Sequence, residues 1–302
     1  MEHNHLHNHE HCHNHASEKR LWISIFLNLI ITIAQVIGGV ISNSLALISD
    51  SFHNLTDTFS MGLSLFASRV SQKECNSNKT FGYKRAEIIA AFINTSLLIA
   101  VSFFLFKEAF ERITKPQIID GKIMLIVAII GLFGNLFSAA LLFKDSQNSL
   151  NIKSAFLHIF TDTLSSFAVI IGGILIIYKG FVIIDPILTF AIGLYVLIIS
   201  YKIFKSTIHI LMQGVPDNIS VDEIKECIEE QDEVNNIHHV HIWSLTGNDI
   251  FFECHICVNK IDMTEVEEIK LKIKNMLKEK FDISHSTLEF ELEGCEDKLI
   301  EK

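Results

Sequence analysis

The sequence lacks the excess of basic residues expected of a protein that binds nucleic acid. Its 25 Lys and Arg residues are outnumbered by 35 Asp and Glu residues, and the formal net charge is −10 at pH 7. A nucleic-acid-binding surface needs a patch or stripe of positive charge that faces the phosphates. The acidic C-terminal part shows no basic helical face either, so we exclude nucleic acid as a partner.

The sequence also lacks the cysteine pattern of a disulfide-stabilised protein. The six cysteines are scattered, at Cys12, Cys75, Cys227, Cys254, Cys257 and Cys295. Most fall in segments assigned below to the cytosol, where thiols stay reduced, so we expect no disulfide framework. Cys254 and Cys257 form a C-x-x-C pair, but on a strand they point to opposite faces, which favours core thiols over a metal pair. We expect no cleavable signal peptide, because the first apolar stretch continues to full membrane-spanning length.

Apolar residues, by contrast, are abundant. They make up 49% of the chain, and the mean hydropathy of +0.35 is too high for an ordinary soluble domain. Charge is unevenly distributed, since 22 of the acidic residues but only 9 of the basic residues follow Ser206. We therefore expect a polar arm over residues 1–18, a membrane domain over 19–206 and an acidic soluble domain over 207–302.

Six apolar stretches of about 20 residues are each long enough to cross a bilayer as a helix. They lie near residues 21–41, 45–68, 87–106, 122–143, 154–178 and 184–204. If the N-terminus is inside, the inner segments contain Lys19, Arg20, Arg69, Lys73, Lys79, Lys84, Arg85, Lys144, Lys153, Lys202 and Lys205. The outer loops contain only Lys107, Arg112, Lys115, Lys122 and Lys179. Basic residues concentrate on the cytoplasmic side of membrane proteins, so we expect both termini in the cytosol.

An internal repeat relates the second and fifth spans. Residues 44–60 (SLALISDSFHNLTDTFS) align without gaps on residues 149–165 (SLNIKSAFLHIFTDTLS). The two spans are an odd number of crossings apart and run in opposite directions, which is the signature of an inverted repeat. A two-fold axis in the membrane plane relates such repeats, so the pair His53 and Asp57 should face the pair His158 and Asp162.

These four residues have the composition of a metal site. In each pair the histidine and the aspartate are four residues apart and share one face of a helix. A carboxylate at the bilayer centre costs roughly 2.5–3.5 kcal/mol on insertion scales, and a divalent cation would neutralise both carboxylates. Two imidazoles and two carboxylates suit tetrahedral zinc, whereas magnesium, calcium and manganese prefer oxygen-rich shells. Polar contacts between helices are the alternative, but the whole motif recurs at equivalent positions. We interpret Asp50, one turn before His53, as a pathway or supporting group.

After Thr207 the pattern becomes that of a soluble domain. It predicts a helix, two strands, a helix and a strand near residues 220–232, 238–245, 250–258, 264–281 and 285–292. This αββαβ order is that of a ferredoxin-like α+β domain with both helices on one face of a three-stranded sheet. By alternation, the other face carries His239, His241, Glu253, His255, Glu289 and Glu291. A face of imidazoles and carboxylates favours a zinc surface, and a merely solvated face is the alternative.

The N-terminal arm alternates histidine with mostly polar residues around Cys12. Its histidines are His3, His5, His7, His9, His11, His13 and His15. Such a segment has no means of burying a core and should be disordered alone. Its imidazoles favour metal capture over the roles of a purification tag or a passive spacer.

Five segments resemble the cation diffusion facilitator family, in its zinc-transporter type: NSLALISDSFHNLTD, FGYKRAEIIAAFIN, LHIFTDTLSS, DPILTFAIGLYV and VHIWSL. The resemblance runs from about Lys19 to Glu291. It implies a homodimer, metal export driven by proton antiport, and a cytosolic metallochaperone-like domain. Many relatives have a histidine-rich loop between spans four and five, which this chain lacks, so any metal-loading role must lie elsewhere.

The resemblance also implies particular site residues. Zinc-type members match His53, Asp57, His158 and Asp162 at the membrane site. Cytosolic ligands match His241, His255 and Glu291, with Glu289 nearby. The triplet His11-Cys12-His13 resembles one that related zinc transporters use to complete a cytosolic dimer site.

We therefore expect a proton-coupled zinc efflux transporter whose substrates are divalent metal ions and protons. It should lie in the lipid bilayer of a bacterial plasma membrane, with Zn²⁺ as cargo and as a structural ion of the cytosolic domain. The residues leave zinc, cobalt and cadmium open as the main cargo. The rival hypotheses are a membrane enzyme with a histidine-bound metal and a metal sensor or scaffold that does not transport. Membrane oxidases have many histidines clustered at the membrane surface, whereas the spans of this chain contain two.

Overall fold

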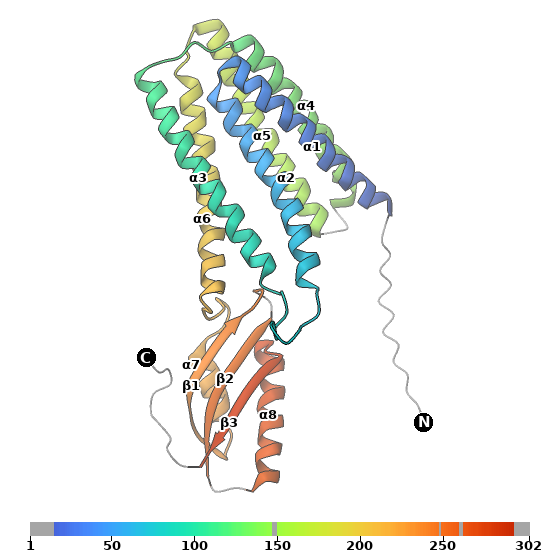
Figure 1. Cartoon of the computed structure of the whole chain (residues 1–302), viewed down its shortest axis with the longest axis vertical. Coiled ribbons are helices and arrows are strands. Elements are labelled where there is room, and N and C mark those ends of the chain that lie inside the picture. Colours follow the sequence, from blue (N-terminus) through green and yellow to red (C-terminus); the bar gives the residue numbers. More distant parts are fainter. Residues whose placement is uncertain (1–14, 147–149, 248, 260–261, 293–302) are drawn as a thin grey trace. The chain divides into compact units, whose positions relative to one another are not determined.

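The computed structural model describes residues 15–146, 150–247, 249–259 and 262–292 (Figure 1). Its long helices are α1 (His15–Ser42), α2 (Leu45–Ser71), α3 (Ala86–Thr114), α4 (Gly121–Ser146), α5 (Leu150–Lys179) and α6 (Ile184–Leu211). They are followed by α7 (Val221–Glu229), β1 (Val234–Ser244), β2 (Ile250–Val258), α8 (Met263–Phe281) and β3 (His285–Glu291). This order confirms the predicted fold class, and the long helices extend past several of the predicted span ends.

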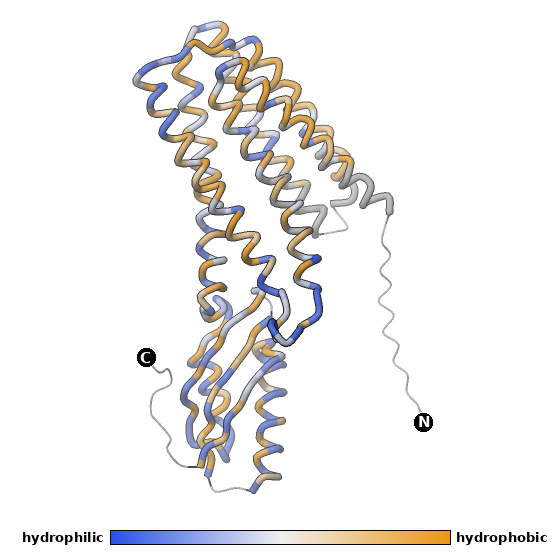
Figure 2. Tube along the Cα trace, viewed as in Figure 1, coloured by the Kyte–Doolittle hydropathy of each residue, from blue (hydrophilic) through white to orange (hydrophobic). Residues whose placement is uncertain are grey.

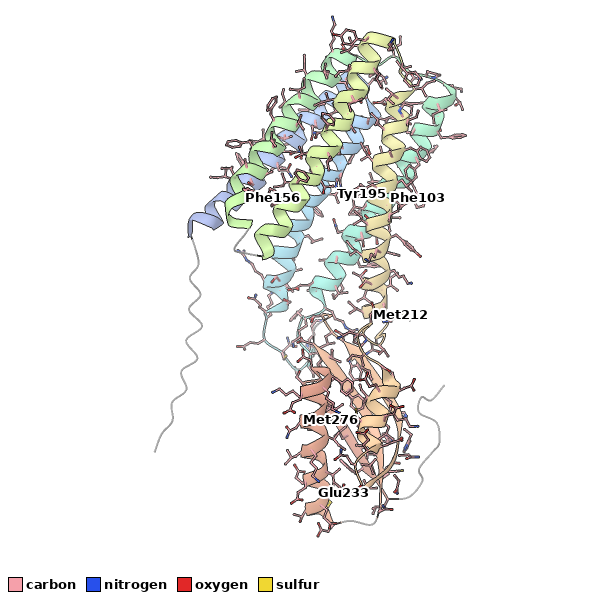
Figure 3. All side chains as sticks on the ribbon, turned by 180° about the vertical axis from the view of Figure 1, so that it is seen from behind. Phe103, Phe156, Tyr195, Met212, Glu233 and Met276 are labelled. Atoms are coloured by element: carbon pink, nitrogen blue, oxygen red, sulfur yellow. The ribbon has the colours of Figure 1, made fainter. Side chains whose placement is uncertain are left out.

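Helices α3 to α6 are each long and apolar enough to cross a membrane. Among the described residues the apolar spans are Ala86–Thr114, Gly121–Phe143, Ile159–Lys179 and Ile184–Leu211. A shorter apolar stretch, Phe26–Ser42, lies in α1. The long helices are orange along most of their length in Figure 2. Large apolar side chains such as Phe103 and Tyr195 are exposed on them (Figure 3), as contact with lipid requires.

The chain divides into two compact units, each considered by itself: residues 1–62 with 96–200, and residues 63–95 with 201–302. In the first unit, the turn between α1 and α2 is tied to two other helices. Asn43 has a φ of 57°, and its carbonyl and side-chain oxygens accept hydrogen bonds from Arg112 of α3. The Asp185 carboxylate of α6 accepts from the backbone N–H groups of Leu45 and Ala46. Because the first N–H groups of a helix have no partner within it, Asp185 caps α2.

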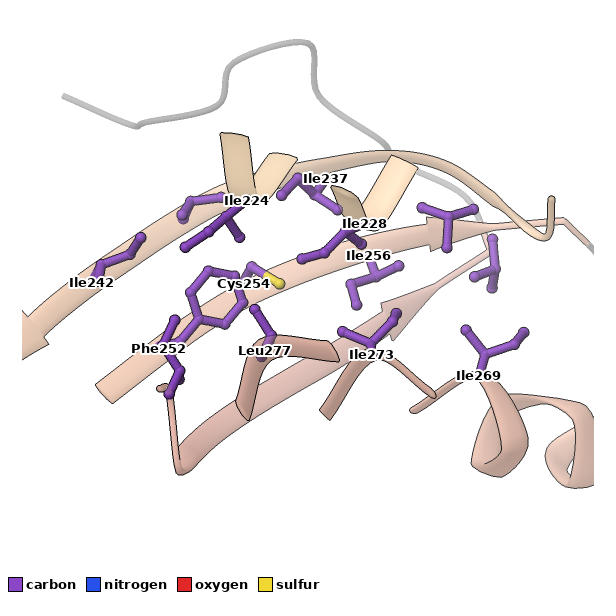
Figure 4. Packing of buried hydrophobic residues seen from close by; sticks show 14 of the residues in the cluster. Ile224, Ile228, Ile237, Ile242, Phe252, Cys254, Ile256, Ile269, Ile273 and Leu277 are labelled. Carbon is purple, nitrogen blue, oxygen red and sulfur yellow. The ribbon is translucent and has the colours of Figure 1, made fainter. Parts of the chain in front are cut away.

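In the second unit, the domain after α6 packs both its helices on one sheet. The strand order is β1-β2-β3, with β1 and β2 antiparallel and β2 and β3 parallel. Figure 4 shows the core, to which α7 contributes Ile224 and Ile228 and α8 contributes Ile273 and Leu277. Both helices begin at a side-chain cap: Ser220 accepts from the third residue of α7, and a capping box opens α8. The predicted ferredoxin-like α+β domain is confirmed.

Strand β1 departs from simple alternation. Its register against β2 shifts between His238 and His241, and His239 has a φ of 52°, which a non-glycine residue adopts rarely. An irregularity of this kind inserts residues into one strand and changes the face on which the next side chain lies. Val240 and Ile242 pack in the core under the helices, whereas His238 is paired with His255 and is buried.

The core position of Ile273 gives a stability test. Ile273 is 1% exposed, whereas Leu271, two residues earlier on α8, is 53% exposed. We expect Ile273→Ala to lower the free energy of unfolding of the isolated domain (residues 215–302) by about 2–5 kcal/mol, because it leaves a cavity. Leu271→Ala is the matched control and should change it by about 0.5 kcal/mol or less. Urea denaturation measures both, and similar losses in the two variants would contradict this core assignment.

Candidate metal sites

The contact between α2 and α5 brings together two of the four residues predicted for the membrane site. The Nε2 atom of His53 lies 3.7 Å from Oδ1 of Asp162, and their side chains are 14% and 1% exposed. A histidine from one helix thus faces an aspartate from the other in a setting almost without access to solvent. A buried carboxylate is stable only beside a cation or hydrogen-bond donors, so Asp162 needs such a partner here.

A second set of contacts fixes the relative direction of α2 and α5. Ser165 and Ser166 of α5 both donate hydrogen bonds to the carboxylate of Asp50. Moving forward along α2 from Asp50 to His53 therefore corresponds to moving backward along α5 from Ser165 to Asp162. The two helices are antiparallel at this contact, as the inverted repeat predicts.

Asp50 belongs to a polar network that also includes α1. Gln35 donates to Oδ2 of Asp50 at 2.8 Å and accepts from Nδ2 of Asn54 at 3.1 Å, and all three side chains are fully buried. Gly131 of α4 makes room for this amide, because a Cβ there would lie 2.7 Å from Nε2 of Gln35. The interpretation of Asp50 as a supporting group fits these contacts, and Gln35 is a further member of the network.

On its other side, His53 borders a small cavity. The cavity has a volume of about 10 Å³ and is lined by residues of α2, α3 and α6, among them Ser49, Ser102 and Gly193. About 10–15 Å³ is the least that holds one water molecule. There is space beside His53 for a single small species.

The other predicted site residues of the membrane and the arm lie outside the described side chains. Asp57 falls within α2 and His158 within α5, but only their backbone is described. His11, Cys12 and His13 precede the first described residue.

In the cytosolic domain, a cluster of imidazoles and carboxylates forms across β1, β2 and β3. His255 Nδ1 is 2.9 Å from Oε1 of Glu291, and His255 Nε2 is 3.5 Å from Oε2 of Glu289. His238 Nε2 is 3.2 Å from the other oxygen of Glu291. Glu291 therefore bridges two histidines from neighbouring strands. The ligand atoms of His255, Glu289 and Glu291 lie close enough together to hold a metal ion. Those of His238, Cys257 and Glu291 form a second group of this kind.

His241 lies differently from the sequence expectation. Among the described residues, it belongs to neither of the two groups of side chains that lie close enough together to hold a metal ion. His241 is exposed, and its ring lies 4.7 Å from that of His239. His238 lies beside His255 instead. Alternation along the strand could not predict that His238 would replace His241, because this change follows from the irregularity in β1.

The two thiols of the C-x-x-C pair have different surroundings. Cys254 is buried in the core, as expected, and burial, with Glu253 adding to it, raises the pKa of its thiol. Cys257 lies on the other face beside His238 and Glu291. It is disulfide-bonded, so the expectation of a core thiol is wrong for it. Its sulfur is a metal ligand only when reduced, which is the state that the cytosol favours.

Comparison with known proteins identifies the family. Residues 21–212 match the cation efflux transmembrane domain, and residues 216–293 match the cytoplasmic domain of cation efflux proteins. The chain therefore belongs to the cation efflux family, which is the family that its motifs resemble. Its members are metal cation transporters and not enzymes, so the hypothesis of a membrane enzyme is wrong.

Three curated relatives match over nearly the whole chain. The chain is 41% identical to the cadmium, cobalt and zinc/H(+)-K(+) antiporter of Bacillus subtilis, over 97% of this chain and 93% of that protein. It is 38% identical to the metal cation efflux system protein CzcD of Cupriavidus metallidurans, over 93% and 88%. It is 36% identical to the zinc transporter ZitB of Pectobacterium atrosepticum, over 98% and 91%.

The exchange of His238 for His241 gives a test of the cytosolic cluster. We expect His238→Ala and His255→Ala each to weaken zinc binding by the isolated domain at least about tenfold, because each removes a donor beside Glu291. His241→Ala removes an imidazole from the same strand and should have little effect. Isothermal titration calorimetry on the three variants checks this. If His241→Ala loses much of its zinc affinity and His238→Ala loses none, the assignment of His238 to the cluster is wrong.

Proposed function

We propose that the chain exports zinc from the cytosol in exchange for protons, on a membrane site formed by His53, Asp57, His158 and Asp162. The observation that carries this proposal is the antiparallel contact of α2 and α5. His53 faces Asp162, and Asp50 faces Ser165 one turn away. Continuing that register by one turn in the other direction pairs position 57 with position 158. The two-fold axis of the repeat exchanges the two pairs, so the second pair should have the geometry of the first.

The spacing within the described pair supports zinc as the ion. Zinc binds histidine and carboxylate at about 2.0–2.2 Å, so neighbouring ligand atoms of a tetrahedral site lie about 3.3–3.6 Å apart. The 3.7 Å between His53 and Asp162 is close to that spacing. The names of the relatives also mention zinc, together with cadmium and cobalt. Ligands of this kind discriminate well against magnesium and calcium, and less well among zinc, cadmium and cobalt.

Proton coupling follows from the chemistry of the ligands. Imidazole titrates near pH 6.5, and only its neutral form binds zinc, so protons and metal compete for His53 and His158. If the site opens to each side in turn, an acidic exterior protonates the histidines and releases zinc. The more neutral cytosol then lets them deprotonate and bind again. Inward proton flow thereby drives outward metal flow, and the B. subtilis relative is named as an antiporter of H⁺.

The remaining features fit the same function. We propose a multi-pass protein of a bacterial plasma membrane, with both termini in the cytosol, divided into the arm 1–18, the membrane domain 19–206 and the cytosolic domain 207–302. The cytosolic domain would hold structural zinc at Glu291, either with His255 and Glu289 or with His238 and reduced Cys257, since donors of these kinds suit that ion. The match to a cytoplasmic domain of cation efflux proteins supports a homodimer. The arm, with His11, Cys12 and His13, would gather metal for loading.

Removal of either membrane carboxylate tests the site. We expect Asp57→Asn and Asp162→Asn each to abolish zinc flux in proteoliposomes while the protein still inserts, because each removes a charged ligand. Asp120→Asn is the matched control: Asp120 is exposed and caps α4, and asparagine caps a helix equally well. Near-normal flux in well-folded Asp57→Asn would rule out the assignment of Asp57 to the site.

Replacement of one imidazole tests the coupling. His53→Asp replaces an imidazole, for which protons and metal compete, by a carboxylate and makes the site richer in oxygen. We therefore expect a weaker dependence of zinc flux on a gradient between about pH 6 and 8, and looser discrimination against other divalent ions. The measurement is zinc and cadmium flux in proteoliposomes, for wild type and variant, with and without the gradient. If wild-type flux ignores the gradient, the antiport mechanism is wrong even where the site is right.

A further inference from the structure

A pocket lies at one end of α3. It lies wholly within the second unit, has a volume of about 450 Å³, and is bordered by the segment before α3, the residues after α6 and the end of β1. Binding pockets for small molecules typically measure about 300–1,000 Å³. None of the residues proposed to bind metal borders it.

The charges around this pocket are of one sign. Lys79, Lys84 and Arg85 line it, and its lining within the described part of the chain includes no carboxylate. Lys84 has a partner outside the lining, Asp249 at 2.8 Å, but both side chains are over two-fifths exposed, so solvent weakens this pair. The Nζ atom of Lys79 lies 5.3 Å from the centre of the Tyr83 ring, which keeps its charge available.

Arg85 is the most informative member. Its Nε atom is buried and has no hydrogen-bond partner among the described residues. A buried donor without a partner costs free energy, and a guanidinium is suited to hold the oxygens of a phosphate group in two-point contact. α3 begins at the next residue, Ala86, so the positive end of its dipole lies at the same place.

The pocket also lies at the level of the membrane surface. The apolar span of α3 begins at Ala86 and that of α6 ends at Leu211, while Ala86 and Gln213 both line the pocket. Trp243 and Tyr83 supply the kind of aromatic side chains that settle at lipid headgroups. Trp243 comes from the cytoplasmic domain, so the adjacent leaflet is the cytosolic one, whose anionic lipids attract basic residues.

We propose that this pocket binds the phosphate headgroup of an anionic phospholipid of the inner leaflet. Arg85 and Lys79 hold the phosphate, and Ile89, one turn into α3 and 47% exposed, lies beside the start of the acyl chains. A free phosphate ion would contact the basic side chains, but it would make no apolar contact with Ile89 and would not depend on the position of the pocket at the membrane. The bound lipid would join the segment before α3 to the cytoplasmic domain, independently of metal.

The test is a lipid titration of the full-length protein in detergent, with bound molecules counted by native mass spectrometry. The probes are phosphatidylglycerol, phosphatidylcholine and inorganic phosphate. We expect saturable binding of phosphatidylglycerol that is about fivefold weaker in Arg85→Gln and about 25-fold weaker in the double variant Lys79→Gln/Arg85→Gln. Lys205→Gln, an equal loss of charge at an exposed position of α6 outside the pocket, should bind as wild type does.

A variant that is expected to bind the lipid more tightly excludes misfolding as the cause of weaker binding in the other variants. Asp249→Asn removes the carboxylate that competes for Lys84, so we expect binding about two- to fivefold tighter. Equal binding of phosphatidylglycerol and phosphatidylcholine, or unchanged binding in the double variant and in Asp249→Asn, would overturn the proposal. Displacement of the lipid by inorganic phosphate at equal concentration would also overturn it, in favour of a soluble anion. None of these measurements involves zinc, so their outcome is separate from that of the transport proposal.

Discussion

The membrane part of this protein depends on how two buried carboxylates, Asp50 and Asp162, are stabilised between α2 and α5. Neither is tolerable in a low-dielectric interior without donors or cations. Asp50 accepts hydrogen bonds from Gln35 and from two serines, so other side chains of the protein stabilise its carboxylate. Asp162 has His53 at 3.7 Å, and an imidazole can exchange a proton for a metal ion. The first carboxylate therefore ties α1, α2 and α5 together, while the second belongs to the metal site proposed above.

The cytosolic domain also separates a structural part from a candidate metal-binding part, and here the two parts are the opposite faces of one sheet. One face of the sheet is a dry core of Ile, Val and Phe residues that holds α7 and α8 in place. The other face gathers His238, His255 and Glu291 from three different strands. No strand has more than one of these three, so the cluster exists only when the sheet is paired. A metal bound there would stabilise the folded domain, because the unfolded chain has no such site.

The sequence predicted the elements well because their periodicities are strong. Apolar runs long enough to cross a bilayer and the αββαβ alternation leave few other arrangements. The repeat of residues 44–60 in 149–165 predicted that the pair His53 and Asp57 would face the pair His158 and Asp162, and His53 lies 3.7 Å from Asp162. It did not predict that His238 would replace His241 beside His255. That change requires a left-handed backbone at His239, which the surrounding sheet imposes and local propensity does not favour.

The polar character of α2 explains why the neighbouring helices are built as they are. A helix with Asp50, His53 and Asn54 along one side cannot turn that side toward lipid, so other helices must cover it. Glycine at position 131 of α4 lets the Gln35 amide come close enough to bridge Asp50 and Asn54, and a methyl group there would push it away. Gly193 of α6, on the opposite side, borders the small cavity beside His53. Small residues therefore let side chains approach closely on both sides of α2: the Gln35 amide at Gly131, and Phe106 at Gly193, where an added Cβ would lie 2.8 Å from the Phe106 ring.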